Sequence, residues 1–371
     1  MHRRRSGHCR HIRSFLTLLG RGAAPLKLVR FFAPRRYRRA LRLHELITGY
    51  WLSQAIYVFA KLHIADLLRA GPHSAAQLAA LSGADADALE RLLRALSACA
   101  VVRMRSDRRF TLTPLGALLQ SRAPLSLRDW ALYNGAPFHW QPWSELLHCV
   151  RTGRTGTEKR FGCGFFDLLA QDRAAAALFD DAMGALSNSQ NALLLRAFDF
   201  KRYRTVVDVG GGRGDLLFAI LRAHRKTRGI LYDLPPVAAA AQARAARAKL
   251  GGRWKTIGGS FFDAVPAGGD LYILKQVVHD WPDDAAVRIL SNCRSAMRHG
   301  AALALVELVV PPAGKAPDAL ANMTDLEMLV CTGGRERSAR EYAALLQRAG
   351  LRFVKLHKGV APLALIEARA N

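Results

Sequence analysis

A glycine-rich turn is the strongest chemical signal in the sequence. Residues 205–214 read Thr-Val-Val-Asp-Val-Gly-Gly-Gly-Arg-Gly, an apolar strand that carries one acid, Asp208, and runs into Gly210, Gly212 and Gly214. Glycine lets the backbone approach a ligand closely, and the N-terminus of the helix predicted next offers free N–H groups to a carboxylate or a phosphate. The spacing differs from the dinucleotide-binding pattern G-x-G-x-x-G. We therefore predict a ligand-binding turn and leave its ligand open at this point.

Two more polar side chains follow predicted strands. Asp233 ends the strand 230–233, nineteen residues after Gly214, where a carboxylate can accept both hydroxyls of a ribose. His279 follows the strand 271–278, at the edge where ligands bind in open α/β sheets, so its imidazole could act as a general base. The sequence Trp-Pro-Asp-Asp that follows is also a plausible helix start. Spacing alone therefore leaves His279 between a catalytic and a structural role.

The elements that position these residues alternate between strands and helices. Apolar strands are predicted near 205–209, 230–233, 256–257, 271–278 and 302–310, with helices between them, and strands 351–357 and 362–368 close the chain. Ser338 and Glu341 form a capping box that opens a helix ending at Gly350. Near-unbroken apolar strands that alternate with helices predict an α/β fold with a doubly wound, mostly parallel sheet.

The preceding region, residues 41–150, has the element order of a winged helix. A helix from His44, a short helix after Ser74 and a third helix from Asp85 precede two short strands, 101–104 and 110–112. Arginines on the third helix and on the wing are compatible with DNA binding. However, the third helix has few side chains that could read base edges. The alternative is an apolar platform that pairs two subunits.

Composition restricts the class of protein. Of the net charge of +26 over 371 residues, half lies in residues 1–44, which contain no Asp or Glu. This segment resembles a mitochondrial transit peptide, and the alternative is a basic, mostly disordered tail. With 50% hydrophobic residues a packed core is expected, whereas no apolar run reaches the ~18 residues that span a bilayer. The six cysteines are scattered without a CxxC pair, which predicts reduced thiols and a reducing compartment.

The combination of motifs resembles the S-adenosylmethionine (SAM)-dependent small-molecule O-methyltransferases, the class of the caffeate, acetylserotonin and bacterial polyketide enzymes. The resemblance runs from about residue 41 to 371 and rests on segments 206–214, 258–262, 274–281 and 328–336 together with Glu307. It implies a Rossmann-like methyltransferase domain with a mostly parallel seven-stranded sheet, preceded by a mainly α winged-helix-like dimerisation domain. The expected division is a basic, disordered extension at 1–40, the dimerisation domain at 41–150, a helical linker that contributes to the substrate pocket at 151–195, and the SAM-binding domain at 196–371.

The resemblance also assigns roles to residues at matching positions. It implies His279 as general base, flanked by the acids Glu307 and Glu336, with no metal. Substrate contacts are expected from Met183, Met328, Phe179 and Asp280. The residues expected to bind SAM are Asp208, Gly210, Gly212, Gly214, Asp233, Ser260, Phe261 and Lys275. This chain departs from the family pattern at Ser260, where an Asp is usual, and at Gln276, where an aromatic residue is frequent.

We therefore expect a cytoplasmic, homodimeric O-methyltransferase of secondary metabolism that acts on a hydroxyl of a small aromatic or polyketide-type molecule, with neither nucleic acid nor membrane as partner. A phenol has a pKa of about 10, so a neutral imidazole can remove its proton as the attack on the methyl group develops. Positioning of the reactants could also carry much of the rate. The alternative function is a winged-helix DNA-binding regulator whose C-terminal domain senses the cofactor. A sensor needs no base, so the presence of His279 with Glu307 and Glu336 argues against it.

Overall fold

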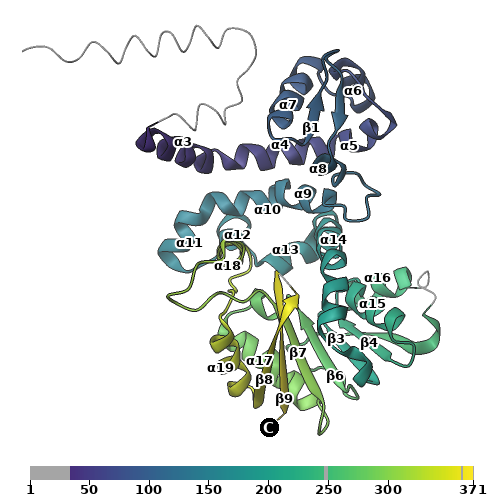
Figure 1. The fold of residues 1–371 in the computed structure, drawn as a ribbon. Helices are drawn as coiled ribbons and strands as arrows, with labels where there is room; N and C mark the ends of the chain where they lie inside the picture. Colours follow the sequence, from purple (N-terminus) through teal and green to yellow (C-terminus); the bar gives the residue numbers. More distant parts are fainter. Residues whose placement is uncertain (1–33, 246–249, 361, 371) are drawn as a thin grey trace, which may run out of the picture. The chain divides into compact units, whose positions relative to one another are not determined.

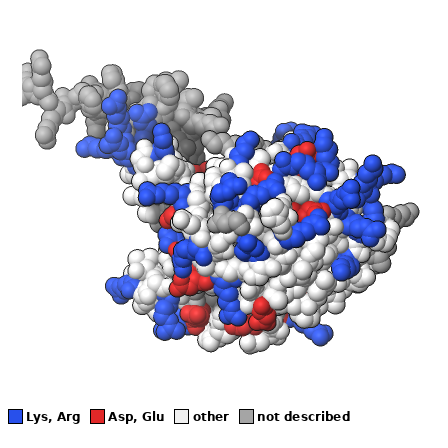
Figure 2. All heavy atoms as spheres, turned by 90° about the horizontal axis from the view of Figure 1, so that it is seen from below, with Lys and Arg blue, Asp and Glu red and all other residues white. Residues whose placement is uncertain are grey.

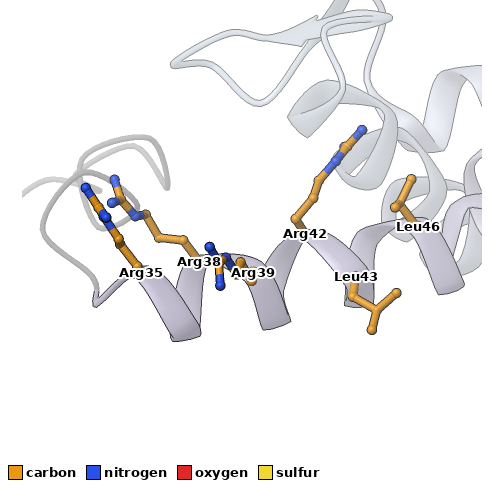
Figure 3. A pocket seen from close by; sticks show the side chains of 6 residues that line it. All are labelled: Arg35, Arg38, Arg39, Arg42, Leu43 and Leu46. Atoms are coloured by element: carbon orange, nitrogen blue, oxygen red, sulfur yellow. The ribbon is translucent and has the colours of Figure 1, made fainter. Parts of the chain in front are cut away.

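The computed structural model describes residues 34–245, 250–360 and 362–370 and divides the chain into two compact units, Met1–Gln54 and Ala55–Asn371 (Figure 1). Most of the predicted basic extension lies outside the described residues. In the first unit, helix α3 (Arg35–Ile47) starts inside the segment predicted to be disordered and ends at Thr48, where α4 (Gly49–Lys61) follows. The sequence pattern predicted one helix from His44. A shallow hollow of about 500 Å³ runs along α3; Figure 3 shows its lining residues Arg35, Arg38, Arg39, Arg42, Leu43 and Leu46.

The second unit begins with the predicted winged-helix order. After α5 (Ile64–Leu67) come α6 (Ala75–Ser82), α7 (Ala86–Ala98) and the hairpin of β1 (Val102–Met104) with β2 (Phe110–Leu112). Ser74 caps α6 through a capping box with Gln77, and Asp85 caps α7, as their positions in the sequence predict. Phe59, Leu93 and other fully buried apolar side chains form the core of this region.

A helical segment joins the winged helix to the sheet. It consists of α8 (Pro114–Ala117), α9 (Arg128–Gly135), α10 (Pro137–Trp140), α11 (Leu146–Thr152), α12 (Gly156–Phe161), α13 (Phe165–Gln171) and α14 (Arg173–Ala197). The long helix α14 is capped by Asp172, whose carboxylate accepts the N–H groups of Ala174 and Ala175. It contacts α9 on one side and α15 of the sheet domain on the other, so it connects the helical segment with the sheet.

Seven strands form one sheet, which confirms the predicted fold class. Their order is β5-β4-β3-β6-β7-β9-β8, and β9 pairs antiparallel with both β7 and β8. The strands are β3 (Thr205–Val209), β4 (Arg228–Asp233), β5 (Trp254–Gly258), β6 (Leu271–Lys275), β7 (Ala302–Glu307), β8 (Leu351–Val360) and β9 (Leu363–Ala370). The helices beside them are α15 (Asp215–Ala223), α16 (Pro235–Ala245), α17 (Asp283–Ala296), α18 (Ala319–Cys331) and α19 (Ala339–Arg348).

Alternating side chains bury both faces of this sheet. Val207 and Leu274 belong to a core that includes residues of α17 and α19, whereas Val206 and Ile273 belong to one that includes residues of α14 and α15. Successive side chains of a strand point to opposite faces, so the near-continuous apolar strands are explained by helices on both sides (Figure 1).

Two strands end earlier than the sequence pattern predicts. β6 stops at Lys275, because Gln276 adopts a positive φ of 53° and residues Val278–Asp280 form a 3-10 turn. β7 stops at Glu307, whose carboxylate accepts the backbone N–H groups of Val277 and Val278 and so fixes the chain where it leaves the sheet. Apolar residues also follow Lys275 and Glu307, so the sequence pattern could not show where the two strands end.

Basic side chains outnumber acidic ones on the face of the molecule seen in Figure 2. On the face seen in Figure 2, Lys and Arg side chains are spread among uncharged residues and are interspersed with Asp and Glu. Among the helices of residues 34–245, 250–360 and 362–370, none combines the length and the apolar character that crossing a bilayer requires. The cysteines of the described residues, Cys99, Cys149, Cys163, Cys293 and Cys331, are all free thiols.

Candidate active site

The site is built at the carboxyl edge of the parallel strands. β3, β4, β6 and β7 run in the same direction, so the residues that end them or follow them meet at one edge. The glycine turn follows β3, Asp233 ends β4, Lys275 ends β6 and Glu307 ends β7. The topology therefore brings together residues that lie about a hundred positions apart in the sequence.

Asp233 holds the backbone of the glycine turn by hydrogen bonds, and the space beside Gly212 is open. The carboxylate of Asp233 accepts the N–H of Gly212 at 2.8 Å through one oxygen and the N–H of Leu234 at 2.7 Å through the other. Gly212 has a φ of 54°, which favours glycine, and a Cβ added there would meet no atom within 4 Å. The backbone of this turn is thus accessible to a ligand, and Asp233 keeps lone pairs for further donors.

Asp208 and Lys275 place buried polar groups beside the turn. Burial raises the pKa of Asp208 to about 7 against the lowering effect of Lys275, and burial lowers the pKa of Lys275 to about 8. Oδ2 of Asp208 has no hydrogen-bond partner among the described residues, and Nζ of Lys275 donates to Oγ of Ser187 at 2.9 Å. An unpartnered buried oxygen and a buried ammonium group suit a ligand with both cationic and anionic groups, such as the amino-acid end of SAM.

The aromatic residue predicted to contact the cofactor also lies at the turn. The ring of Phe261 lies 3.6 Å from the position that a Cβ of Gly210 would take. Its neighbour Ser260 accepts the backbone N–H of Phe262 at 3.2 Å through Oγ, so this hydroxyl stabilises the loop. The glycines, Asp208, Asp233, Phe261 and Lys275 are therefore gathered at one edge. Their contacts with a cofactor remain a prediction, as does a contact of Ser260.

His279 lies in the 3-10 turn after β6 and does not begin a helix. It is 5% exposed, and α17 starts only at Asp283. Its Nδ1 lies 2.7 Å from Oε1 of Glu336 and 3.9 Å from Oε2 of Glu307, while its Nε2 lies 3.8 Å from Oδ1 of Asp280. The hydrogen bond to Glu336 fixes the ring and leaves Nε2 as the nitrogen available to another group.

Three carboxyl groups around one imidazole favour its cation. Burial by itself would lower the pKa of His279, but the charges of Glu307, Asp280 and Glu336 raise it to about 10. Burial in turn raises the pKa of Glu307 to about 7 and that of Asp280 to about 6, each opposed by His279. The arrangement therefore stabilises a proton that His279 has accepted.

The donor atoms of His279, Glu307 and Glu336 lie within 4.8 Å of one another and could also hold a metal ion. Hydrogen bonds alone can explain why these side chains lie together without a metal ion. Val277 and Val278 donate to Glu307, and His279 donates to Glu336. The absence of a metal stays a prediction.

Motif spacing predicted no role for the side chains that support the His279 turn. Arg337 is 1% exposed and donates to the carbonyl oxygens of Val278 and Trp281 at 3.2 and 2.8 Å. It also pairs with Asp283 at 2.8 Å. Its place in the Gly-Gly-Arg-Glu-Arg segment marks it as part of a motif, but only the structure shows that Arg337 is buried while Arg335 is exposed.

Two further features hold Glu336 opposite His279. The carboxylate of Asp325 on α18 accepts the N–H of Glu336 at 2.8 Å. Gly334 lets the chain approach closely, because a Cβ there would lie 2.0 Å from the carbonyl oxygen of His279. A conflict of this size excludes any larger residue without a backbone shift.

The predicted substrate residues occupy elements around this turn. Asp280 follows His279 directly, and Met328 is buried on α18. Phe179 and Met183 of α14 belong to an aromatic cluster with Phe166, whose ring stacks on Trp281 at 5.4 Å. This cluster therefore reaches the His279 turn, and contact of these side chains with a substrate remains a prediction.

Comparison with known proteins agrees with this site. Residues 143–352 match the family model of the O-methyltransferase domain, and residues 44–122 match that of the O-methyltransferase dimerisation domain. The chain is 42% identical to a phenazine O-methyltransferase from Lysobacter antibioticus over 88% of this chain and 95% of the relative. The structure of a mitomycin 7-O-methyltransferase has a TM-score of 0.85 and 36% identity, covering 91% of this chain and 99% of that one. An O-methyltransferase from neocarzinostatin biosynthesis, in complex with S-adenosyl-L-homocysteine and 1,4-dihydroxy-2-naphthoic acid, has a TM-score of 0.75 and 35% identity over 86% of this chain and 96% of that one.

Proposed function

Because the chain belongs to the family of SAM-dependent O-methyltransferases, we propose that it transfers the methyl group of SAM to a hydroxyl of a small aromatic or polyketide-type molecule. The observation that carries the proposal is the buried His279–Glu336 pair at the sheet edge that also holds the glycine turn. The aromatic acceptor class is supported by the relatives, which include enzymes named for phenazine and mitomycin substrates.

The residues at the turn fit the cofactor by their chemistry. SAM supplies an electrophilic methyl group on a positively charged sulfur. Asp233 would accept the ribose hydroxyls, Phe261 would cover the adenine, and the hydroxyl of Ser260 would take the place of the usual carboxylate there. Asp208 and Lys275, with Gly210, Gly212 and Gly214, would bind the methionine end.

His279 acts on the acceptor hydroxyl. In the neutral form of His279 the ring proton lies on Nδ1 and is donated to Glu336, so the lone pair of Nε2 can accept the proton of the acceptor hydroxyl. The oxygen becomes a strong nucleophile as this proton leaves, and Glu336 and Glu307 stabilise the imidazolium that forms. Asp280, Met183, Met328 and Phe179 would hold the acceptor next to Nε2.

We also propose that the enzyme works as a homodimer in the cytoplasm. Leu46, Ile47, Tyr50 and Trp51 are each more than half exposed and lie within the match to the dimerisation domain. Apolar side chains at this density are typical of an interface. The free thiols fit a reducing compartment. We assign residues 1–40 to the basic extension, 41–150 to dimerisation, 151–195 to the linker and 196–371 to methyl transfer.

Ion pairs within the wing argue against the alternative function of DNA binding. Arg108 pairs with Glu90, while Arg105 and Arg109 pair with Asp107, so intramolecular acids compete for the side chains that would have contacted phosphates. We therefore propose no nucleic-acid partner.

Methyl transfer and cofactor binding test the proposal together. We expect the purified chain to move a labelled methyl group from SAM to at least one member of a panel of phenols and naphthols, with the product identified as an aryl methyl ether by mass spectrometry. We expect Gly212→Val to weaken SAM binding at least tenfold in calorimetry, because a side chain would occupy the open face of the turn and strain its backbone. Unchanged SAM affinity in this variant would show that the assigned cofactor site is wrong.

A further inference from the structure

A second buried acid–base cluster lies outside the residues assigned above. Its centre is Glu327 of α18, and we call it the Glu327 cluster. Oε1 of Glu327 lies 2.6 Å from Nε2 of His139 and accepts the thiol of Cys331 at 3.3 Å, and Oε2 accepts the indole N–H of Trp143 at 2.7 Å. His139 is 4% exposed and Cys331 is 2% exposed. The three donors come from two segments of the chain, residues 139–143 and the end of α18, so the fold brings them together around one carboxylate.

The hydrogen-bond pattern fixes where the protons lie. Burial alone would raise the pKa of Glu327, but the contact with His139 and the hydrogen bonds from His139, Cys331 and Trp143 hold it below its ordinary value. Glu327 is therefore a carboxylate, and each of its partners donates to it. Nε2 of His139 consequently carries a proton, which leaves Nδ1 as the second functional atom of this imidazole.

Nδ1 of His139 is buried and has no hydrogen-bond partner among the described residues. An unpaired buried polar atom destabilises a folded protein, so this nitrogen calls for an explanation. The ring itself is held on one edge by Glu327 and lies 4.2 Å, centre to centre, from the ring of Tyr133. An imidazole fixed in this way with one unused nitrogen is suited to recognising a ligand.

The Glu327 cluster adjoins the acceptor side of the reaction centre. The charge of Glu327 contributes to the raised pKa of Asp280, the residue next to His279. Burial raises the pKa of Tyr133, whose ring lies beside that of His139, and the charges of Glu327 and Asp280 raise it further. Helix α18 also carries Asp325, which holds the backbone of Glu336, and Met328. Helix α18 therefore connects the His279–Glu336 pair, the proposed substrate residue Met328 and the Glu327 cluster.

We propose that Nδ1 of His139 accepts a hydrogen bond from a hydroxyl or amino substituent of the methyl acceptor, at a position other than the hydroxyl that is methylated. The inference rests on the proposed function and names the acceptor class more narrowly. A donor substituent fits because the Nε2–H donated to Glu327 leaves a lone pair on Nδ1. An anionic substituent would approach Glu327, Asp280 and Glu336 and be repelled. Trp143 and Cys331 act as positioning residues for Glu327.

The experiment compares three matched probes on the full chain with bound S-adenosylhomocysteine. They are naphthalene-2,7-diol, 2-naphthol and 7-methoxy-2-naphthol, and their dissociation constants are measured by calorimetry. We expect the diol to bind the wild-type enzyme about tenfold more tightly than the other two. His139→Gln keeps an N–H donor for Glu327, but its acceptor, the amide oxygen Oε1, lies one atom further along the side chain than Nδ1. We therefore expect it to lose this preference while its affinity for 2-naphthol is unchanged. His148→Gln is the control and should keep the preference.

Several outcomes would overturn the inference. A diol preference that survives in His139→Gln, or a wild-type enzyme that binds 7-hydroxy-2-naphthoic acid more tightly than the diol, would contradict it. So would one equivalent of zinc in the purified wild-type protein that is lost in His139→Gln, since the N, O and S donors of His139, Glu327 and Cys331 lie within 4.8 Å of one another. Methyl transfer to any probe would at the same time support the proposed function independently of His139. If no probe binds or is methylated, both the acceptor class and the role of His139 are wrong.

Discussion

The imidazole of His279 has more acidic neighbours than a single acid–base pair would need. Glu336 supplies the hydrogen bond, whereas Glu307 and Asp280 act over 3.9 and 3.8 Å. The residue types and their assignment to one site were predictable from the motifs. Which acid holds the ring was not, because Glu307 and Glu336 are 28 and 57 positions from His279 and their distances depend on the turn geometry. The structure assigns the direct contact to Glu336.

This arrangement has a consequence for the pH dependence. The anions raise the pKa of His279, so the imidazole is protonated below that pKa and can act as a base only as pH rises through it. We expect kcat/KM to increase with pH. In Glu336→Gln the raising effect of one anion is lost, so the rising limb should move by about 1–2 pH units to lower pH, with a maximal rate about tenfold lower.

A pH–rate profile of the wild type, of Glu336→Gln and of Glu158→Gln measures this shift. Glu158 is an exposed acid on α12, so its substitution should leave the profile where it is. A profile of Glu336→Gln that coincides with that of the wild type would show that Glu336 does not control the protonation of His279.

At the scale of elements, the site depends on where two strands end. The sequence predicted all seven strands of the sheet and their type, because apolar runs between helices have few other interpretations. It placed the ends of β6 and β7 about three residues too late and thereby put Glu307 in the middle of a strand. The signals that end these strands are a positive φ at Gln276 and a carboxylate that accepts two backbone N–H groups, and neither leaves a local pattern in the sequence.

The turn that carries His279 is held by Arg337, so its loss should affect both stability and rate. In Arg337→Met the carbonyl groups of Val278 and Trp281 lose their donor and Asp283 loses its partner. We expect the free energy of unfolding to fall by about 3 kcal/mol in urea titration and kcat to fall more than KM rises. Arg335→Met removes an exposed guanidinium two residues away and should change stability by less than about 0.5 kcal/mol. Equal effects of the two substitutions would contradict the role given to Arg337.

At the scale of the whole molecule, the sequence allowed two interpretations of the winged-helix region, DNA binding and the pairing of two subunits. The structure confirmed the element order, and the match to a dimerisation domain favours subunit pairing. Sequence alone could not separate these readings, since arginines on a wing look the same whether they face phosphates or neighbouring acids. The pairing of Arg105, Arg108 and Arg109 with Asp107 and Glu90 distinguishes them.

Subunit pairing can be tested on the exposed apolar residues of α3 and α4. We expect the wild-type chain to sediment as a dimer, and the double substitution Leu46→Asp with Trp51→Asp to shift it to a monomer, because charges would replace apolar area that is 61% and 57% exposed in one chain. Val354→Asp introduces one of these charges on β8 and should leave the dimer intact. A doubly substituted chain that stays dimeric in analytical ultracentrifugation would place the interface elsewhere.

The central claim is that His279 removes the proton of the acceptor hydroxyl, and a single-turnover measurement tests it most directly. Enzyme saturated with methyl-labelled SAM is mixed with an acceptor that the wild type methylates, and the rate of label transfer is compared with that of His279→Ala. We expect the variant to bind SAM with unchanged affinity and to transfer the methyl group at least 100-fold more slowly, in line with the typical contribution of a general base. Transfer by His279→Ala at the wild-type rate, with the same SAM affinity, would contradict the claim.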